Sequence, residues 1–213
     1  RMVHVHPVST DSDQLRQYVK FGIDLYKDNA YYVPPLISDD VASLTPDKNP
    51  AFDFCEAQSF MAFRNGEPVG TITAIINRAA NEKTGRRQMR FGFVNFVDDA
   101  EVVDELFAAV EEWGRCRGMT EIVGPMGFSD LDQEGMLIEG FEEDGTMATI
   151  YNYPYYPEHM VRMGYEKDAD WIEYRITVPP EVPEKHARIA EIVARKYNLS
   201  VKKYTTKKKI KAE

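Results

Sequence analysis

One amphipathic helix pattern, placed between two strand patterns, constrains the fold of this 213-residue chain more than any other feature. The helix pattern begins at Asp98 or Asp99, either of which can cap it, and Gly118 ends it. Strand patterns lie on both sides, at residues 88–97 and 120–123. Its apolar stripe, which faces away from a row of acids, consists of Val102, Leu106, Ala109, Trp113 and Cys116. A helix that joins two strands of one sheet makes a right-handed crossover, so the two strands are predicted to be parallel.

Further strand patterns precede this unit. Residues 56–64 and 69–77 flank the dipeptide Asn65-Gly66, which favours a tight hairpin because both residues tolerate positive φ. A polar connection over residues 81–87 leads to the strand before the helix. Sequential strands with short links predict an antiparallel meander.

The N-terminal part adds a strand and a helix. Residues 2–8 alternate as a short edge strand, and nothing in them resembles a signal peptide. Asp11 or Ser12 can cap a helix that runs to about residue 27.

The C-terminal part alternates between helix and strand patterns. Pro157 fits the first turn of a short helix that ends at Gly164, and residues 171–178 predict a final strand. Prolines then interrupt the chain before a helix over residues 184–197. A basic strand or tail over residues 201–211 follows.

The charge distribution bears on the partners of the chain. The formal net charge is −9, and residues 98–173 hold 20 acidic against 4 basic residues. Such a stretch disfavours nucleic acid and suits a cationic partner such as an amine, although a solvated acidic surface explains it equally simply. No apolar run is long enough to predict a membrane span. Cys55 and Cys116 are far apart and fit neither a metal-binding spacing nor a disulfide framework, which indicates a protein of the reducing cytoplasm. His4 and His6 could share a metal ion only with a third ligand, and the sequence offers none nearby.

Two local motifs, taken with the order of elements, resemble the GNAT (acyl-CoA N-acyltransferase) superfamily. Residues 65–72, Asn-Gly-Glu-Pro-Val-Gly-Thr-Ile, are similar to the hairpin between its second and third strands, and residues 161–166, Val-Arg-Met-Gly-Tyr-Glu, to the end of its late helix. The resemblance implies a GNAT-like domain over residues 1–178. Its α/β fold has a mixed, mostly antiparallel sheet flanked by helices, with one parallel crossover around the central helix. Residues 179–213 then form a C-terminal helix and basic strand, with a linker to a second half as one interpretation.

A narrower resemblance points to a bacterial family of uncharacterised GNAT-like proteins. Residues 32–36 (Tyr-Val-Pro-Pro-Leu), 124–126 (Gly-Pro-Met) and 151–156 (Tyr-Asn-Tyr-Pro-Tyr-Tyr) carry it. Members of that family usually have a second C-terminal half, so this resemblance implies that the chain is one part of a longer protein.

The GNAT resemblance implies acyl-CoA or acetyl-CoA as co-substrate, with its pyrophosphate at the start of the central helix. The usual signature there contains glycines and a base, whereas residues 96–101 contain neither and hold three acids. Like charge of this kind repels phosphate, so weak binding is expected, and a simple N-cap is the competing interpretation. The implied cofactor-binding residues, along the preceding strand and at the helix start, are Asn95, Phe96, Val97, Asp99, Ala100 and Glu101.

The resemblance also implies a general acid and a general base. The superfamily often places a tyrosine that acts as the general acid four residues before the late glycine, which is Gly164 here. Met160 occupies that position in this chain, so Tyr156, about one turn earlier, is the nearest substitute. Glu134, with Asp132 beside it, is the candidate base for deprotonating an amine. Weaker alternatives are Glu56, Glu139 and His159. Each carboxylate also fits an ordinary surface position, and the tyrosines a rigid packed wall.

Two functions stay open at this point. One is N-acyltransfer from acyl-CoA to a small-molecule amine, without a metal. The other is a non-catalytic GNAT-like module that binds a cationic ligand or docks against a second domain or a second copy. Strands that part near Val97 favour the enzyme, and a gap filled by Tyr153, Tyr155 or Phe128 favours the module.

Overall fold

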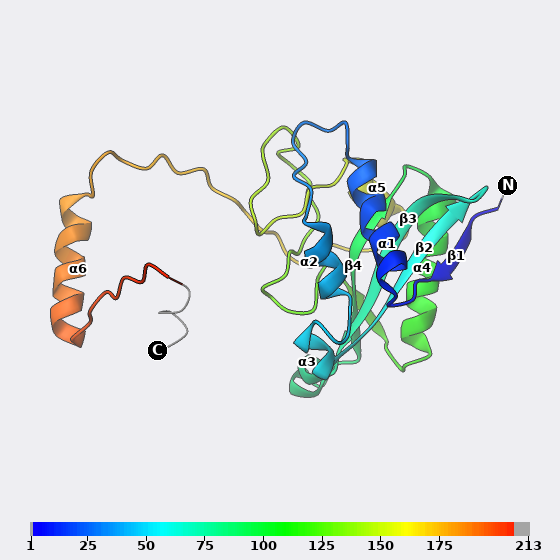
Figure 1. Ribbon diagram of the computed structural model, residues 1–213, viewed down its shortest axis with the longest axis horizontal. Helices are drawn as coiled ribbons and strands as arrows, with labels where there is room; N and C mark the ends of the chain where they lie inside the picture. The colour runs from blue at the N-terminus through cyan, green and yellow to red at the C-terminus, as the bar shows by residue number, and fades with distance from the viewer. Residues whose placement is uncertain (1, 207–213) are drawn as a thin grey trace. The chain divides into compact units, whose positions relative to one another are not determined.

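The computed structural model describes residues 2–206, and the chain divides into two units, Arg1–Asp170 and Trp171–Glu213. The first unit is built on a five-stranded sheet with the order β1-β2-β3-β4-β5 (Figure 1). The strands are β1 (His4–Pro7), β2 (Cys55–Arg64), β3 (Glu67–Asn77), β4 (Gln88–Phe96) and β5 (Glu121–Val123). Neighbouring strands are antiparallel except for β4 and β5, which are parallel, so the mixed sheet predicted from the sequence is confirmed.

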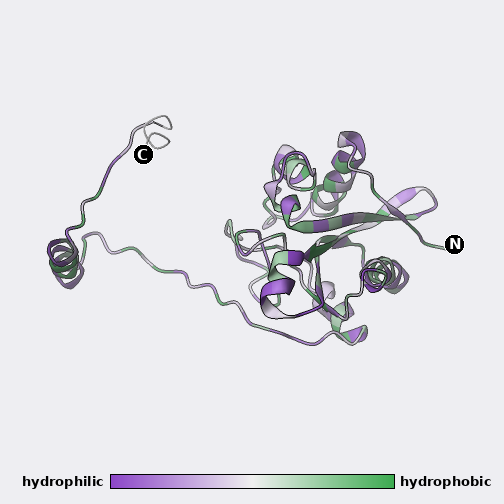
Figure 2. Cartoon of the chain, turned by 90° about the horizontal axis from the view of Figure 1, so that it is seen from below, coloured by the Kyte–Doolittle hydropathy of each residue, from purple (hydrophilic) through white to green (hydrophobic). Residues whose placement is uncertain are grey.

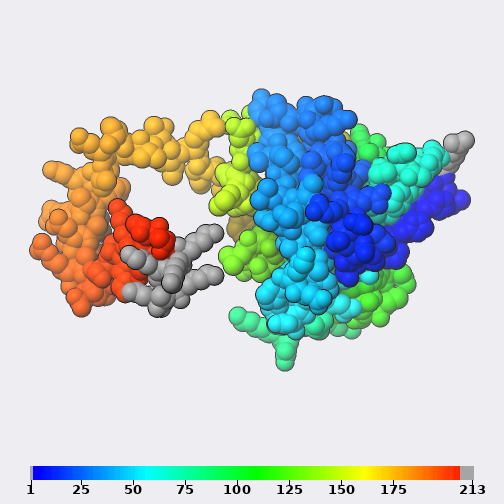
Figure 3. Space-filling view, in the orientation of Figure 1, coloured from blue at the N-terminus to red at the C-terminus, as the bar shows by residue number. Residues whose placement is uncertain are grey.

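Helices cover both faces of this sheet (Figure 2). The helices α1 (Ser12–Leu25) and α2 (Ile37–Ser43) lie over one face, which Figure 3 presents to the viewer. The helices α4 (Ala100–Arg115) and α5 (Tyr155–Arg162) lie on the other face. A 3₁₀ turn, η1 (Pro50–Asp53), leads into β2.

Two hydrophobic clusters follow from the alternation of side chains along the strands. Ile72 and Phe96 are fully buried against α4 and α5, in a cluster with Val102 and Leu106. Ile75 points the other way and packs with α1 and α2. Burial of a side chain of this size stabilises the fold by about 1.5–3 kcal/mol. Of the predicted helix stripe, Val102 and Leu106 are buried against the sheet, and Ala109 and Trp113 pack partly against it. Cys116 is exposed, because α4 ends at Arg115.

Two local predictions were wrong. The expected polar connection over residues 81–87 is mostly the helix α3 (Arg78–Thr84), which Asn77 caps and which buries no residue, so it has no apolar stripe to reveal it. Residues 171–178, expected as a strand, form none in the described part of the chain, and large side chains there such as Trp171 are exposed. The late helix begins at Tyr155, so Pro157 lies in its first turn as predicted.

The second unit contains one helix, α6 (Glu184–Tyr197), within its described residues. Asn198, in the left-handed region at φ 51°, ends it, as the predicted bounds required. Of the predicted basic segment, residues 201–206 form no strand and 207–211 lie outside the described residues. None of the described helices combines the length and the apolar character that a bilayer crossing needs.

Candidate functional site

The two parallel strands separate soon after they pair. Only three residue pairs join β4 and β5, the last being Arg90 with Val123. Beyond them the Met126 N–H still donates to the Phe91 carbonyl at 2.8 Å, and β4 continues alone to Phe96. A Cβ on Gly92 would lie 2.2 Å from the Met126 carbonyl oxygen, so glycine is required where the chain crosses β4. The fold therefore leaves the edge of β4 beyond Gly92 without a neighbouring strand among residues 2–206.

A bulge in β4 lies next to this free edge. Thr71 pairs with Asn95 but Thr73 pairs with Gly92, so β4 holds one extra residue, and Phe93 has a positive φ of 48°. The Tyr18 hydroxyl of α1 donates to the Phe93 carbonyl at 2.9 Å. The bulge thus turns a backbone acceptor toward the α1 side of the sheet.

The end of β4 is held by two tyrosines of α5. The Phe96 N–H donates to the Tyr156 hydroxyl at 3.0 Å, and the Tyr155 hydroxyl donates to the Phe96 carbonyl at 2.7 Å. The rings of Phe96 and Tyr156 also stack at 4.1 Å. Burial raises the pKa of Tyr156 far above its ordinary value, so this hydroxyl keeps its proton.

A row of stacked tyrosines continues from these contacts. Tyr26, at the end of α1, stacks at 4.6 Å on both Tyr32 and Tyr153, and Tyr153 stacks on Tyr155. The Tyr26 ring is 1% exposed, and its hydroxyl has no hydrogen-bond partner among the described residues. The row joins the α1 side of the sheet to α5.

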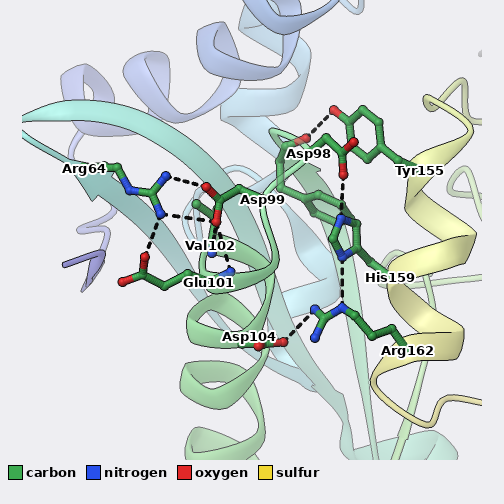
Figure 4. Close-up of polar contacts among 10 residues, drawn as sticks. Arg64, Asp98, Asp99, Glu101, Val102, Asp104, Tyr155, His159 and Arg162 are labelled. Atoms are coloured by element: carbon green, nitrogen blue, oxygen red, sulfur yellow. Dashed lines mark hydrogen bonds and ion pairs between the residues drawn. The ribbon is translucent and has the colours of Figure 1, made fainter. Parts of the chain in front are cut away.

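Asp99 and Arg64 occupy the start of α4 (Figure 4). Asp99 is the N-cap, and its Oδ1 accepts from the N–H groups of Glu101 and Val102. Arg64, at the end of β2, binds Asp99 through both terminal nitrogens and Glu101 at 2.8 Å. This arginine holds the pKa of the Asp99 carboxyl below its usual range.

These contacts correct one expectation and bear out another. The turn carries no base in its own sequence, but the fold brings one from β2, so two of its three acids are paired with Arg64. The simple N-cap interpretation of Asp99 is confirmed. Because Asp99 already satisfies two helix N–H groups, an incoming phosphate would have to compete with it for them.

A second polar chain joins α5 to α4 (Figure 4). His159 Nε2 lies 2.8 Å from Asp98 Oδ1, and the Arg162 Nε–H donates to His159 Nδ1 at 3.3 Å. Arg162 also binds Asp104. Since Nδ1 accepts, the proton of a neutral ring lies on Nε2 and points to Asp98. Both ring nitrogens are engaged, which disfavours His159 as a free base.

One solved structure decides the fold. A tandem GNAT protein from the clavulanic acid biosynthesis pathway, without AcCoA, matches 76% of this chain and 43% of its own, with a TM-score of 0.50 and 16% sequence identity. The chain has the fold of the GNAT superfamily.

Two curated relatives of this chain are bacterial proteins. One, named Bacterial ceramide synthase, from Caulobacter vibrioides, is 33% identical over 181 residues, which are 84% of this chain and 47% of the relative. Another, Protein YghO from Escherichia coli K12, is 31% identical over 164 residues, which are 77% of this chain and 42% of the relative. The chain therefore spans about half the length of the curated relatives it matches. No protein-family model matches it.

The GNAT fold places the predicted base Glu134 in the long loop before α5. It is half-buried and forms an isolated bridge with Thr149, and no described hydrogen bond joins it to Tyr156. Asp132 accepts from the Ser129 N–H at 2.9 Å and so holds a turn of the loop. Glu56 forms ion pairs with Arg117 and Arg78.

The sequence did not point to one partly buried acidic residue. Asp40 of α2 is half-buried, and burial, with the charge of Asp39 next, raises its pKa to about 6. The sequence carries no specific signal for this burial, because neighbouring positions of a helix are about 100° apart and both Asp39 and Asp40 could have faced solvent.

Two hollows lie in the surface of the first unit, away from the residues where β4 and β5 separate. One, of about 310 Å³, is lined by residues of α1 and β2 such as Leu15 and Ser59. The other, of about 570 Å³, is a shallow apolar groove beside α5 that includes Phe141 and Val161. Neither is lined by a residue of β4 or β5. Within the described residues, no three His, Cys, Asp or Glu side chains gather as a metal site would require.

Proposed function

We propose that this chain is a GNAT-type N-acyltransferase domain, which moves an acyl group from acyl-CoA or acetyl-CoA to a small-molecule amine. The observation that carries the proposal is the parting of β4 and β5 after three residue pairs. It leaves the outward N–H and C=O of Phe96 bound to side-chain hydroxyls in place of a neighbouring strand. Backbone groups of this kind suit the amides of an extended pantetheine arm.

The donor arm would lie along Asn95, Phe96 and Val97. The Val97 N–H bonds Val69 of β3, so among these residues Phe96 offers its backbone groups on the free side. Rotation of Tyr155 and Tyr156 away from Phe96 would exchange two hydroxyl contacts for two amide contacts. The exchange is nearly even in hydrogen-bond number, and a single hydrogen bond contributes about 0.5–1.5 kcal/mol.

Tyr156 would act as the general acid and Glu134 as the candidate base. The amine nitrogen attacks the thioester carbon, the carbon–sulfur bond breaks, and the departing thiolate takes a proton. Burial keeps Tyr156 protonated, which supports the first role. Glu134 stays a proposal on loop position alone, since the loop that carries it runs from β5 to α5.

The start of α4, at Asp99, Ala100 and Glu101, would contribute little to holding the phosphates of the donor. Asp99 caps two N–H groups and Arg64 is engaged by two carboxylates. We therefore propose that most donor affinity comes from the pantetheine arm and the acyl group.

The name of one relative suggests the first acceptor to test. A ceramide is the amide of a long-chain amino alcohol, so that name describes N-acylation. The relatives are about twice as long, and a second domain or a second copy of the chain is the proposed partner. The cytoplasm is the proposed compartment, since Cys55 and Cys116 are both free thiols.

Thiol release on mixing the protein with acyl-CoA and an amine tests this proposal. We expect release that depends on the amine, with acetyl-CoA and a long-chain acyl-CoA compared side by side. The measurement uses the chain together with any second half of its natural protein. Amine-independent release, or none, would argue against N-acyltransfer.

A non-catalytic module is the second candidate, favoured by one observation. Tyr155 and Tyr156 fill the parting at Phe96, and Asp99 occupies the helix start where a donor would bind. Such a module binds a cationic ligand without acyl-CoA. Calorimetry distinguishes the enzyme from the module. A non-catalytic module should give a heat of binding with an amine and none with acyl-CoA.

A further inference from the structure

The helix α6 of the second unit has an apolar face that is open to solvent. Ile189, Ile192, Val193 and Tyr197 follow one another at intervals of three or four residues, so their side chains lie on one side of the helix. These four residues are between 38% and 61% exposed, and none of the 14 residues of α6 is buried. A helix of a folded protein ordinarily covers such a face with another element.

The opposite side of α6 is charged. Arg188, Glu191 and Arg195 lie there, and Arg195 forms an ion pair with Glu191 at 3.9 Å. A helix that only connects two domains through solvent is polar on all sides. The division of α6 into an apolar and a charged side therefore argues against the interpretation of this segment as a linker.

The chain also specifies where α6 ends. Asn198 adopts the left-handed conformation, and the Leu199 N–H donates to the Ala194 carbonyl at 2.9 Å, which closes the last turn. A helix of this length is marginal in water by itself, because starting a helix is costly and packing of its apolar face supplies most of its stability. A helix with a defined end and an open apolar face is incomplete without a partner surface.

We propose that the apolar face of α6 packs against the second half of a longer natural protein. The matched regions are only 47% and 42% of the two curated relatives, so each relative has about as much chain again outside the match. The inference rests on the proposed function for the existence of that second half and needs no acyl transfer. It makes α6 part of an interface between the halves.

A second copy of the chain fits this face less well. The helix is about 21 Å long at a rise of 1.5 Å per residue. Its four exposed apolar side chains offer less than the roughly 800 Å² per partner that a stable interface between separate proteins buries. A second half that is joined covalently needs no such area, because the link keeps its effective concentration high.

Hydrogen–deuterium exchange of the α6 amides, followed by mass spectrometry, tests the proposal. It compares residues 1–213 with the longer natural protein. In residues 1–213 alone, we expect these amides to exchange nearly as fast as those of an unfolded peptide. In the longer protein they should exchange at least about a hundredfold more slowly, because the docked face then has to separate before the helix opens.

Ile192→Ala and Arg188→Ala form a matched pair, one on each side of α6. Alanine favours helix at both positions, so changed exchange reports on packing. In the longer protein, Ile192→Ala should speed exchange at least about tenfold, since it leaves a cavity in the interface, and Arg188→Ala should leave it unchanged. Thermal unfolding checks that both variants fold, and Ile192→Val, a smaller truncation, replaces Ile192→Ala if that variant does not.

The outcomes separate this inference from the proposed function. Equal exchange in the two proteins, equal effects of the two alanine variants, or a natural protein without a second half would overturn the α6 interface. Slow exchange in residues 1–213 that depends on protein concentration would also overturn it, because a second copy would then cover the face. Slow, Ile192-dependent exchange in a longer protein that transfers no acyl group would support the interface and reject the proposed function.

Discussion

The Tyr156 hydroxyl accepts a 3.0 Å hydrogen bond from the backbone N–H of Phe96, 60 residues earlier in the chain. Both groups are buried, and the bond joins α5 to the edge of β4 that β5 has left. The same hydroxyl is the proposed proton donor. The Tyr156 hydroxyl therefore has both a structural role and a proposed chemical role. Stability and activity measurements on substituted proteins separate the two roles.

Replacing Tyr156 by phenylalanine leaves the Phe96 N–H buried without an acceptor. We expect the free energy of unfolding to fall by about 1–2 kcal/mol. Tyr155→Phe is the matched control, because the half-buried Tyr155 donates to the carbonyl of the same residue, and its loss should be smaller. Urea unfolding measures both. Equal losses, or none, would show that the Tyr156 contact adds nothing to stability.

The turnover number kcat of the same two variants tests the chemical role of Tyr156. Tyr156→Phe should lower kcat by about a hundredfold or more if its hydroxyl protonates the thiolate. Tyr155→Phe should change kcat far less. A Tyr156→Phe protein with normal kcat would remove Tyr156 from the mechanism.

Asp99 has two functions that different substitutions separate. Asp99→Ser keeps an N-capping oxygen and removes one of the two carboxylates that bind Arg64, leaving the pair with Glu101. Arg64 can then also bind a phosphate, so the affinity for acyl-CoA should rise on the order of tenfold. Asp99→Ala removes the cap as well and should cost about 1 kcal/mol of stability. Calorimetry and thermal unfolding measure the two effects. If Asp99→Ser binds acyl-CoA no better than the wild type, the acid does not limit donor binding.

The raised pKa of Asp40 makes stability depend on pH. The folded protein holds this proton up to about pH 6, whereas the unfolded chain releases it near pH 4, so the charged form destabilises the folded state above pH 6. Asp40→Asn should therefore be more stable than the wild type at pH 7.5 by about 1–2 kcal/mol. The difference should shrink as the pH falls from 6 to 4. A destabilised variant at pH 7.5 would mean that Asp40 has a structural partner.

Gly92 tests the crossing of the Met126 backbone over β4. Gly92→Ala places a Cβ 2.2 Å from a carbonyl oxygen, and we expect a loss of about 2 kcal/mol or more because backbone has to move. Gly145→Ala, whose Cβ would meet only Thr149 Oγ1 at 3.6 Å, is the control and should change little. An unchanged free energy of unfolding in Gly92→Ala would mean that the Met126 backbone does not lie this close to Gly92.

Much of the sheet was predictable because local signals and packing agree. Asn65 and Gly66 both adopt the positive φ that their hairpin required, and Gly118 does so after α4. The strand expected at 171–178 fails for the opposite reason. An apolar alternating pattern predicts a strand only where a partner exists, and the large side chains of these residues are exposed in the described structure.

The site was predictable only in part, because its contacts join distant segments. The acids at the start of α4 were visible in the sequence, but Arg64 comes from β2, and no local spacing connects it with Asp99. Tyr156 was predicted from its place near Gly164. Its hydrogen bond to the Phe96 N–H could not be predicted, because that bond depends on how α5 packs against β4. Asp40 was missed because burial is the main cause of its raised pKa, and no local spacing in the sequence shows that burial.

Titration of acetyl-CoA and of a long-chain acyl-CoA into the protein, followed by calorimetry, tests the central claim most directly. The account predicts saturable binding of one acyl-CoA per chain below millimolar concentration, weakened when a bulky side chain blocks the edge of β4 at Phe96. No heat up to millimolar acyl-CoA, from a protein that unfolds cooperatively and is therefore folded, would contradict the proposed acyl transfer.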